Sequence, residues 1–271
     1  MSLRRIAGVT LLVSAMFLLT GVCVADELRG GLLWDKWWKV NGSPAPTGDH
    51  PLYPPEGSRT GDTTFRCKEC HGWDYKGVDG AYAPGSSHFT GIPGVFGTTL
   101  SAGELFDLIK NPSSTTPNGH DFGTFGLADF DIQDLVDFLL IELIDTDLYI
   151  SQQGIFQGDE VMGEEDYNND AVCRVCHGTD GTNIDFDPPD GVYVGTIASE
   201  NPWEFIHKVR FGQPDTAMPS WIQRGGSDQE AANIGRHAQF NLVGGTGEAS
   251  FFEDGFESGD TSGWSGQAPP P

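Results

Sequence analysis

Two short stretches of the chain repeat the same order of apolar and polar residues at helical spacing. Residues 104–110 read Glu-Leu-Phe-Asp-Leu-Ile-Lys, and residues 204–210 read Glu-Phe-Ile-His-Lys-Val-Arg. Apolar residues that recur three and four positions apart predict a helix with one buried face. Each stretch leads through a loop rich in glycine and proline to a second predicted helix, at residues 131–144 and 228–240. The pattern therefore predicts an all-α, loop-rich fold built from two similar units.

The boundaries of these units follow from changes in composition. We expect the first unit over residues 61–150 and the second over residues 151–243. Residues 26–60 precede them as an N-terminal extension, which begins with a short aromatic helix at residues 32–38 and continues as a proline-rich loop. Residues 244–271 are rich in glycine, serine and acidic residues and end in three prolines, so they are predicted to form a flexible tail.

Residues 1–25 have the pattern of a signal peptide. Two arginines precede an apolar run over residues 9–19, and small residues then form a cleavage site. The run is shorter than the about 20 residues that a membrane-spanning helix needs. A lipoprotein anchor at Cys23 is disfavoured, because Val22 stands where that signal needs glycine or alanine. We therefore expect an exported protein, periplasmic or at the cell surface, with no membrane span in its mature chain.

The charge of the chain is strongly negative. It has 39 acidic and 15 basic residues, which gives a formal net charge of −24 at pH 7. Such a surface repels phosphate backbones, and this argues against nucleic acid as a partner. The charge is compatible with redox partners that present a basic face, and equally with an acidic surface that is simply solvated.

Four of the five cysteines lie in two copies of Cys-x-x-Cys-His, 106 residues apart. The copies consist of Cys67, Cys70 and His71, and of Cys173, Cys176 and His177. This spacing is the attachment signature of c-type haem. Two thiols on one helical turn can bond the two vinyl groups, and the next histidine reaches the iron from below. We therefore expect two covalent haem c groups, with His71 and His177 as proximal ligands.

Three other interpretations of the paired cysteines are weaker, and a zinc centre in particular leaves the adjacent histidines unexplained. A thioredoxin-like pair requires βαβ units, and their pattern is not visible in the sequence. A single zinc centre would combine both pairs. Two disulfides are compatible with an exported protein.

Each unit resembles a class I c-type cytochrome. The resemblance covers roughly residues 60–243 and rests on the order of attachment motif, glycine-containing loop, amphipathic helix, distal-ligand loop and final helix. It implies two tandem cytochrome c-like domains, each a small all-α fold wrapped around one haem with an edge near solvent. It also implies a proline-containing loop whose carbonyl orients the proximal histidine, for which Pro93 and Pro189 are candidates.

The distal ligands are predicted from position in this order of elements. Met218 precedes a proline and follows His177 by 41 residues, where class I cytochromes place their methionine. The first unit has no methionine, and His120, in the matching loop 49 residues after His71, is its predicted distal ligand. Because Met/His haems have higher potentials than bis-histidine haems, the first haem should have the lower potential. The rival ligands are His88 and His50 for the first haem and His207 and His237 for the second.

These features favour an electron carrier or relay over an enzyme. A dihaem oxidoreductase acting on a sulfur compound or a peroxide is the main alternative, but the sulfur-oxidising type needs a third cysteine and a peroxidase needs an open distal position. A second alternative is a cytochrome subunit of a dehydrogenase or respiratory complex, with Trp34, Trp37 and Trp38 as a docking face or, alternatively, as part of the core.

Overall fold

The computed structural model describes residues 27–169 and 173–246 of the chain. Within these ranges the protein is helical and has no β-strand, only three isolated bridges between extended segments. This agrees with the predicted all-α class. The predicted signal peptide and nearly all of the predicted tail lie outside the described residues. The α-helices are α1 (Glu27–Asn41), α2 (Cys67–His71), α3 (Ala102–Lys110), α4 (Phe122–Phe125), α5 (Asp129–Asp137), α6 (Glu160–Asn169), α7 (Cys173–His177), α8 (Val194–Glu200), α9 (Pro202–Phe211) and α10 (Asp228–Asn241).

Helices α3 and α10 begin at capping boxes. Before α3, the Ser101 side chain accepts a hydrogen bond from the Glu104 backbone, and the Glu104 carboxylate accepts one from the Ser101 backbone. Ser227 and Glu230 form the same arrangement before α10. Each box satisfies backbone N–H groups that the first helical turn leaves unpaired. The helix predicted at residues 131–144 is α5, which begins two residues earlier and continues as a π-helical turn at Phe138–Glu142.

Helix α1 is longer than predicted and belongs to the packed core. It runs from Glu27 to Asn41 with a kink at Lys36, and it packs against α5. Trp34, Trp37 and Trp38 are all buried, and the Trp37 indole N–H donates a hydrogen bond to a backbone carbonyl. The interpretation of these tryptophans as a docking face is therefore wrong. Burial of such large aromatic side chains supplies much of the apolar interior that the loop-rich chain otherwise lacks.

Two helix crossings of the same kind organise the molecule. Gly30 of α1 lies directly against the Asp134 carbonyl of α5, and Gly163 of α6 lies against the Asn233 carbonyl of α10. A side chain at either glycine would collide with the backbone of the opposite helix. A buried aromatic residue follows four positions after each glycine, Trp34 in α1 and Tyr167 in α6. The pairs α1–α5 and α6–α10 are thus built in the same way.

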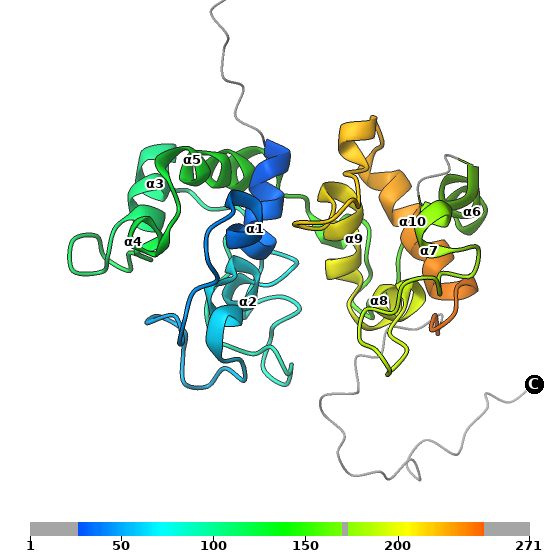
Figure 1. The fold of residues 1–271 in the computed structure, drawn as a ribbon, viewed down its shortest axis with the longest axis horizontal. Coiled ribbons are helices and arrows are strands. Elements are labelled where there is room, and N and C mark those ends of the chain that lie inside the picture. Colours follow the sequence, from blue (N-terminus) through cyan, green and yellow to red (C-terminus); the bar gives the residue numbers. More distant parts are fainter. Residues whose placement is uncertain (1–26, 170–172, 247–271) are drawn as a thin grey trace, which may run out of the picture.

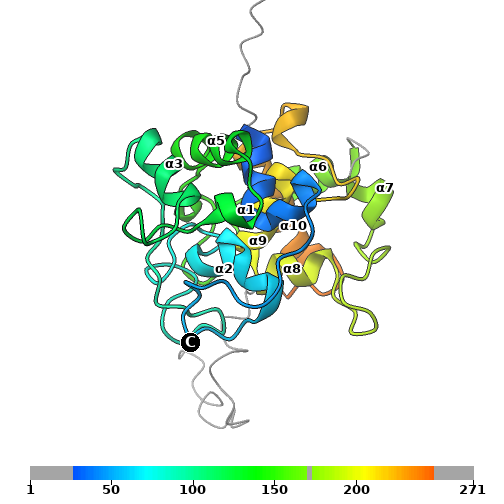
Figure 2. The ribbon, with the colours of Figure 1, turned by 60° about the vertical axis from the view of Figure 1, so that its left-hand side comes forward.

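Figure 1 shows helices α1–α5 on one side of the molecule and α6–α10 on the other, with α9 facing α1. Turning the molecule brings α1 to the centre, between the two groups (Figure 2). Tyr75, which follows α2, hydrogen-bonds through its hydroxyl to His207 Nδ1 of α9 at 2.9 Å, and both side chains are buried. Direct side-chain bonds therefore join the two groups of helices.

Candidate haem-attachment sites

The first Cys-x-x-Cys-His motif forms the short helix α2. Cys67 begins the helix and His71 ends it, so both thiols lie on the same turn. Gly72 follows with φ of 81°, a left-handed conformation that favours glycine. The chain then folds back, and Gly77 N donates to the His71 carbonyl at 2.9 Å.

The second motif has the same local structure. Helix α7 runs from Cys173 to His177, Gly178 has φ of 85°, and Asn183 N donates to the His177 carbonyl at 3.0 Å. The Tyr167 hydroxyl of α6 donates to the Gly178 carbonyl at 2.8 Å and ties this helix to the motif. Both motifs therefore present two thiols and a histidine on one short helix that a glycine terminates.

The cysteine environments do not fit the alternative chemistries. The four thiols form no disulfide in the structure. Burial raises the pKa of Cys67 and Cys70 to about 12 and that of Cys173 to about 11. A reactive redox pair requires the opposite shift, since the thiolate is the nucleophile. Helices α2 and α7 lie on opposite sides of the molecule (Figure 1), and the described residues contain no cluster of three metal-binding side chains, so the two pairs do not form one zinc centre.

His71 is oriented by the loop that was predicted to hold it. Its Nδ1–H donates to the Pro93 carbonyl at 2.8 Å, which leaves Nε2 for a metal. Burial lowers the pKa of His71 to about 4, so the imidazole is neutral at pH 7, as a metal ligand must be. The indole of Trp34 lies against it, with ring centres 6.0 Å apart.

His120 faces the same site from the loop between α3 and α4. Its ring centre is 6.1 Å from that of His71. Two metal–imidazole bonds of about 2.0–2.1 Å, with the two ring radii, account for roughly this separation. The His120 backbone N donates to the Leu108 carbonyl at 2.8 Å, and its Nδ1 lies 3.3 Å from the same oxygen. The residues around α2 therefore fit a covalently attached haem with two histidine ligands.

The two rival histidines for the first haem have other partners. His88 stacks on Tyr82, with ring centres 4.9 Å apart, and its Nδ1 lies 3.7 Å from a Glu69 carboxylate oxygen. His50 uses both ring nitrogens in hydrogen bonds, to the His120 carbonyl and to Leu52 N. Arg59 Nη2 lies 3.2 and 3.3 Å from the two ring nitrogens of His88, so every ring nitrogen of these two histidines has a polar partner other than His71.

The predicted ligands of the second motif are not brought together in the same way. His177 contacts Phe186, and its buried Nδ1 has no hydrogen-bond partner among the described residues, so the expected bond to the Pro189 carbonyl does not form. Met218 lines a groove with Leu28 and Leu32 of α1. In the first unit the His120 N–H donates to a carbonyl near the end of α3. The corresponding bond to the end of α9 comes from the N–H of Trp221, three residues after Met218. Spacing along the sequence could not reveal this difference between the two loops.

The rival histidines of the second unit are both buried. His207 is bonded at both ring nitrogens, to Tyr75 and to the Gly31 carbonyl, and so belongs to the contact between the two groups of helices. His237 packs against Tyr167, and neither of its ring nitrogens has a hydrogen-bond partner among the described residues.

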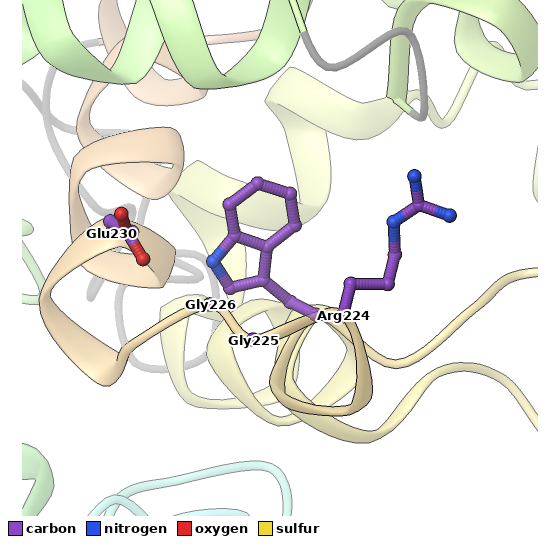
Figure 3. A pocket seen from close by; sticks show the side chains of 5 residues that line it. Arg224, Gly225, Gly226 and Glu230 are labelled. Atoms are coloured by element: carbon purple, nitrogen blue, oxygen red, sulfur yellow. The ribbon is translucent and has the colours of Figure 1, made fainter.

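A pocket of about 420 Å³ lies between the short 3-10 turn at Ile222–Arg224 and the start of α10. Its lining includes Trp221, Arg224 and Glu230, and Figure 3 shows the Arg224 guanidinium pointing away from Glu230. Burial dominates the raised pKa of Cys173, and the positive charge of Arg224 acts on it in the opposite direction. Arg224 therefore places a positive charge near the attachment segment.

Comparison with known families supports the chemistry of the second motif. Residues 160–237 match the family model described as cytochrome c oxidase, cbb3-type, subunit III. The second half of the chain contains a cytochrome c domain. This domain extends from α6 through α7 and α9 into α10, so the match spans the crossing at Gly163 as well as Cys173 and His177.

Other comparisons add little to this match. No curated protein matches the chain. A solved structure from Kuenenia stuttgartiensis, a reducing HAO-like protein complex, is similar at 15% identity, covering 65% of this chain and 91% of that chain, with a TM-score of 0.24. A TM-score this low does not establish a shared fold. Among the described residues, no helix is both long enough and apolar enough to cross a bilayer.

Proposed function

We propose that the chain is an exported protein that carries two covalent haem c groups and passes electrons between redox partners. Each haem takes two thioether bonds, one proximal histidine and one distal ligand, in the order Cys67, Cys70, His71 and His120 for the first haem and Cys173, Cys176, His177 and Met218 for the second.

The observation that carries the proposal is the pairing of His71 with His120. Their ring centres are 6.1 Å apart, and each ring has its Nδ1 next to a backbone carbonyl oxygen. A carbonyl that accepts from Nδ1 fixes the tautomer and the ring plane and makes Nε2 a better ligand. Two histidines held in this way, beside two thiols on one turn, are a suitable ligand set for one haem iron.

The role of the protein is to bind the haem iron and to keep small molecules away from it. Bound haem iron supplies one-electron exchange between its ferrous and ferric forms. His120 fills the sixth position of the first haem, which denies it to small molecules and favours electron transfer over peroxide or sulfur chemistry. Burial keeps His71 neutral, so no proton competes with the metal at physiological pH.

The second haem is supported by the cytochrome c domain match and by the shared construction of the two halves. Helix pairs α1–α5 and α6–α10 cross at a glycine in the same way, which favours two tandem domains over residues 61–150 and 151–243, with α1 of the N-terminal extension packed on the first. Met218, followed by Pro219, is the proposed distal ligand of the second haem. Its thioether stabilises ferrous iron, so this haem should have the higher potential.

Haem content and potentials test the proposal together. A pyridine haemochrome assay with intact mass should give two haems per chain, and a redox titration should give two separate waves. In the H120M variant the lower wave should move to higher potential while the upper wave stays in place. H88M is the matched control, because His88 lies in the same unit but contacts Glu69 and Tyr82 instead of His71. A haem count below two, or a lower wave that does not respond to H120M, would contradict the assignment.

The proposed partners and location follow from charge and from the N-terminal pattern. The charge of −24 favours redox proteins with a basic face, and the rate of electron exchange with such a partner should fall as salt is added. Cell fractionation should recover the haem-stained protein outside the cytoplasm, with a mass that lacks residues 1–25.

A further inference from the structure

His50 lies in the loop between α1 and α2 and contacts residues both near to it and far from it in the sequence. It is 5% exposed, and its ring packs among Phe65, Phe122 and Phe125, with ring centres 5.0–5.4 Å apart. Its backbone N donates to Thr64 Oγ1 at 2.8 Å. The imidazole is therefore held firmly from several sides by residues that adjoin α2 and by residues of α4.

Both ring nitrogens of His50 have partners, and these partners fix its tautomer. Nδ1 accepts from Leu52 N at 3.2 Å, so the proton is on Nε2, which donates to the His120 carbonyl at 3.0 Å. A histidine bonded in this way cannot bind iron without breaking one of these bonds. Instead it ties the loop after α1 to the backbone of the proposed distal ligand.

The loop that carries His120 needs such external support. Asn118 and Asp121, on either side of His120, have φ of 59° and 60°, left-handed conformations that cost energy for residues other than glycine. Such conformations persist only where surrounding contacts hold them. The His120 backbone has two such contacts, its N–H bond to Leu108 of α3 and its carbonyl bond from His50.

We propose that His50 is a positioning residue that keeps the sixth position of the first haem closed by holding the His120 loop in place. This inference rests on the proposed function, since it assumes a haem on Cys67 and Cys70 with His120 as ligand. The hydrogen bond from His50 would thus limit the binding of small neutral ligands to ferrous iron, for which carbon monoxide is the probe.

Two substitutions separate the two hydrogen bonds of His50. In H50N the shorter amide can still accept from Leu52 N, because an asparagine side chain in a turn accepts from the backbone N–H two residues later. The same amide does not reach the His120 carbonyl. In H50Q the longer amide can donate to the His120 carbonyl, while the bond from Leu52 is lost. H50F keeps an aromatic ring among the three phenylalanines and removes both bonds.

The readout is the ferrous–CO difference spectrum of the purified holoprotein, with the lower redox wave and the haem count measured on the same samples. H50N and H50F should increase the CO-binding fraction of the first haem roughly fivefold over wild type, as expected for loss of one net hydrogen bond, and H50Q should stay close to wild type. The triple variant H50N/C173S/C176S, compared with C173S/C176S, lacks the second attachment site and so assigns the CO signal to the first haem.

The outcomes separate the inference from the proposed function. If two haems are attached and H50N, H50Q and H50F all bind CO as wild type does, His50 is not a positioning residue for His120, although the cytochrome assignment stands. If H50N and H50Q open the site equally, the bond to His120 is not the cause and the inference fails. If no haem is attached at Cys67 and Cys70, the proposed function fails at its first site. Should H50F not fold, the pair H50N and H50Q still decides the question.

Discussion

Asp35 is almost fully buried between two cations that come from distant parts of the sequence. Its carboxylate is paired with Arg66, next to the first attachment motif, and with Lys208 of α9. Burial works to raise the pKa of Asp35, but the charges of Lys208 and Arg66 outweigh it and hold the pKa well below the usual range. Asp35 is therefore charged at pH 7, and it pairs with two cations that have little access to water.

Replacing Asp35 should lower the unfolding free energy, because the two buried cations lose their shared carboxylate. In D35N, Lys208 loses its paired carboxylate and Arg66 keeps only the longer pair with Glu69 at 3.7 Å, and breaking a buried ion pair in this way costs about 3–5 kcal/mol of unfolding free energy. Urea unfolding of the holoprotein measures the loss. The matched control is D215N, because Asp215 pairs with Lys39 where both side chains are exposed, and such pairs contribute about 0–1 kcal/mol. Equal effects of the two variants would show that the Asp35 cluster is not a stabilising element.

At the scale of single residues, the sequence predicted the attachment chemistry but could not decide which of several histidines is the distal ligand. The Cys-x-x-Cys-His spacing was enough to select six residues, because thiols and imidazole must share one helical turn. His50, His88 and His120 are all plausible by spacing. They differ in what their ring nitrogens contact, and those partners come from Leu52, Glu69 and Leu108, which no local pattern connects to them.

Among the helices, the crossing of α1 with α5 and of α6 with α10 depends on two glycines. A Cβ at Gly30 would meet the Asp134 carbonyl, and a Cβ at Gly163 would meet the Asn233 carbonyl, both of which are backbone atoms that cannot rotate away. Because helix backbones approach this closely only at a residue without a side chain, the glycines set the distance between the helices of each pair.

The substitutions G30A and G163A should each lower the unfolding free energy by about 1–3 kcal/mol, since overpacking forces the helices apart. G103A is the matched control in α3, where nothing lies within 4 Å of the added Cβ. That variant should be neutral or stabilising by up to about 1 kcal/mol, because alanine loses less backbone entropy in a helix. Thermal unfolding followed by circular dichroism compares the three, and losses in G30A and G163A no larger than in G103A would rule out a tight crossing.

Periodicity predicted α3 and α10, and capping explains where they begin, whereas only residues 32–38 of α1 were predicted as a helix. Ser101 with Glu104, and Ser227 with Glu230, are visible as pairs three residues apart, and an apolar stripe follows each. Helix α1 has apolar residues around much of its circumference and a kink at Lys36, so its pattern does not show which face has a partner. The signal that identifies it is Gly30 four residues before Trp34, matched by Gly163 before Tyr167, and this is recognised only when the two crossings are compared.

Across the whole molecule, the two groups of helices are joined by buried polar contacts as well as by apolar packing. His207 of α9 donates from Nε2 to the Gly31 carbonyl of α1 and accepts at Nδ1 from the Tyr75 hydroxyl. The Asp35–Lys208 pair crosses the same boundary. A hydrogen-bonded contact of this kind holds a specific relative orientation, which a purely apolar surface does less well because it has no directional bonds. No pattern within either unit predicts it, since each partner looks like an ordinary core or surface residue of its own helix.

His207 gives this contact a defined dependence on pH. Burial lowers its pKa to about 3, from 6.5 in the unfolded chain. A group whose pKa is lower in the folded state stabilises the fold fully above its unfolded pKa, and this stability is lost as pH falls from about 6.5 toward about 3. Protonation adds a hydrogen to Nδ1, where the Tyr75 hydroxyl must donate, so the contact across the boundary breaks as the charge appears.

Comparison of wild type with H207Q isolates this effect from the titration of the other histidines and of the carboxylates. Between pH 6 and pH 4, the unfolding free energy of wild type should fall more steeply than that of H207Q, by at most about 1.4 kcal/mol per pH unit, which corresponds to one proton. Urea titrations of both holoproteins across this range measure the difference in slope. Parallel slopes of unfolding free energy against pH would mean that His207 takes up no additional proton on unfolding. The contact between the two groups of helices would then be insensitive to acid. A steeper wild-type slope, accompanied by separation of one unfolding transition into two near the lower limit, would show that the neutral imidazole couples the halves.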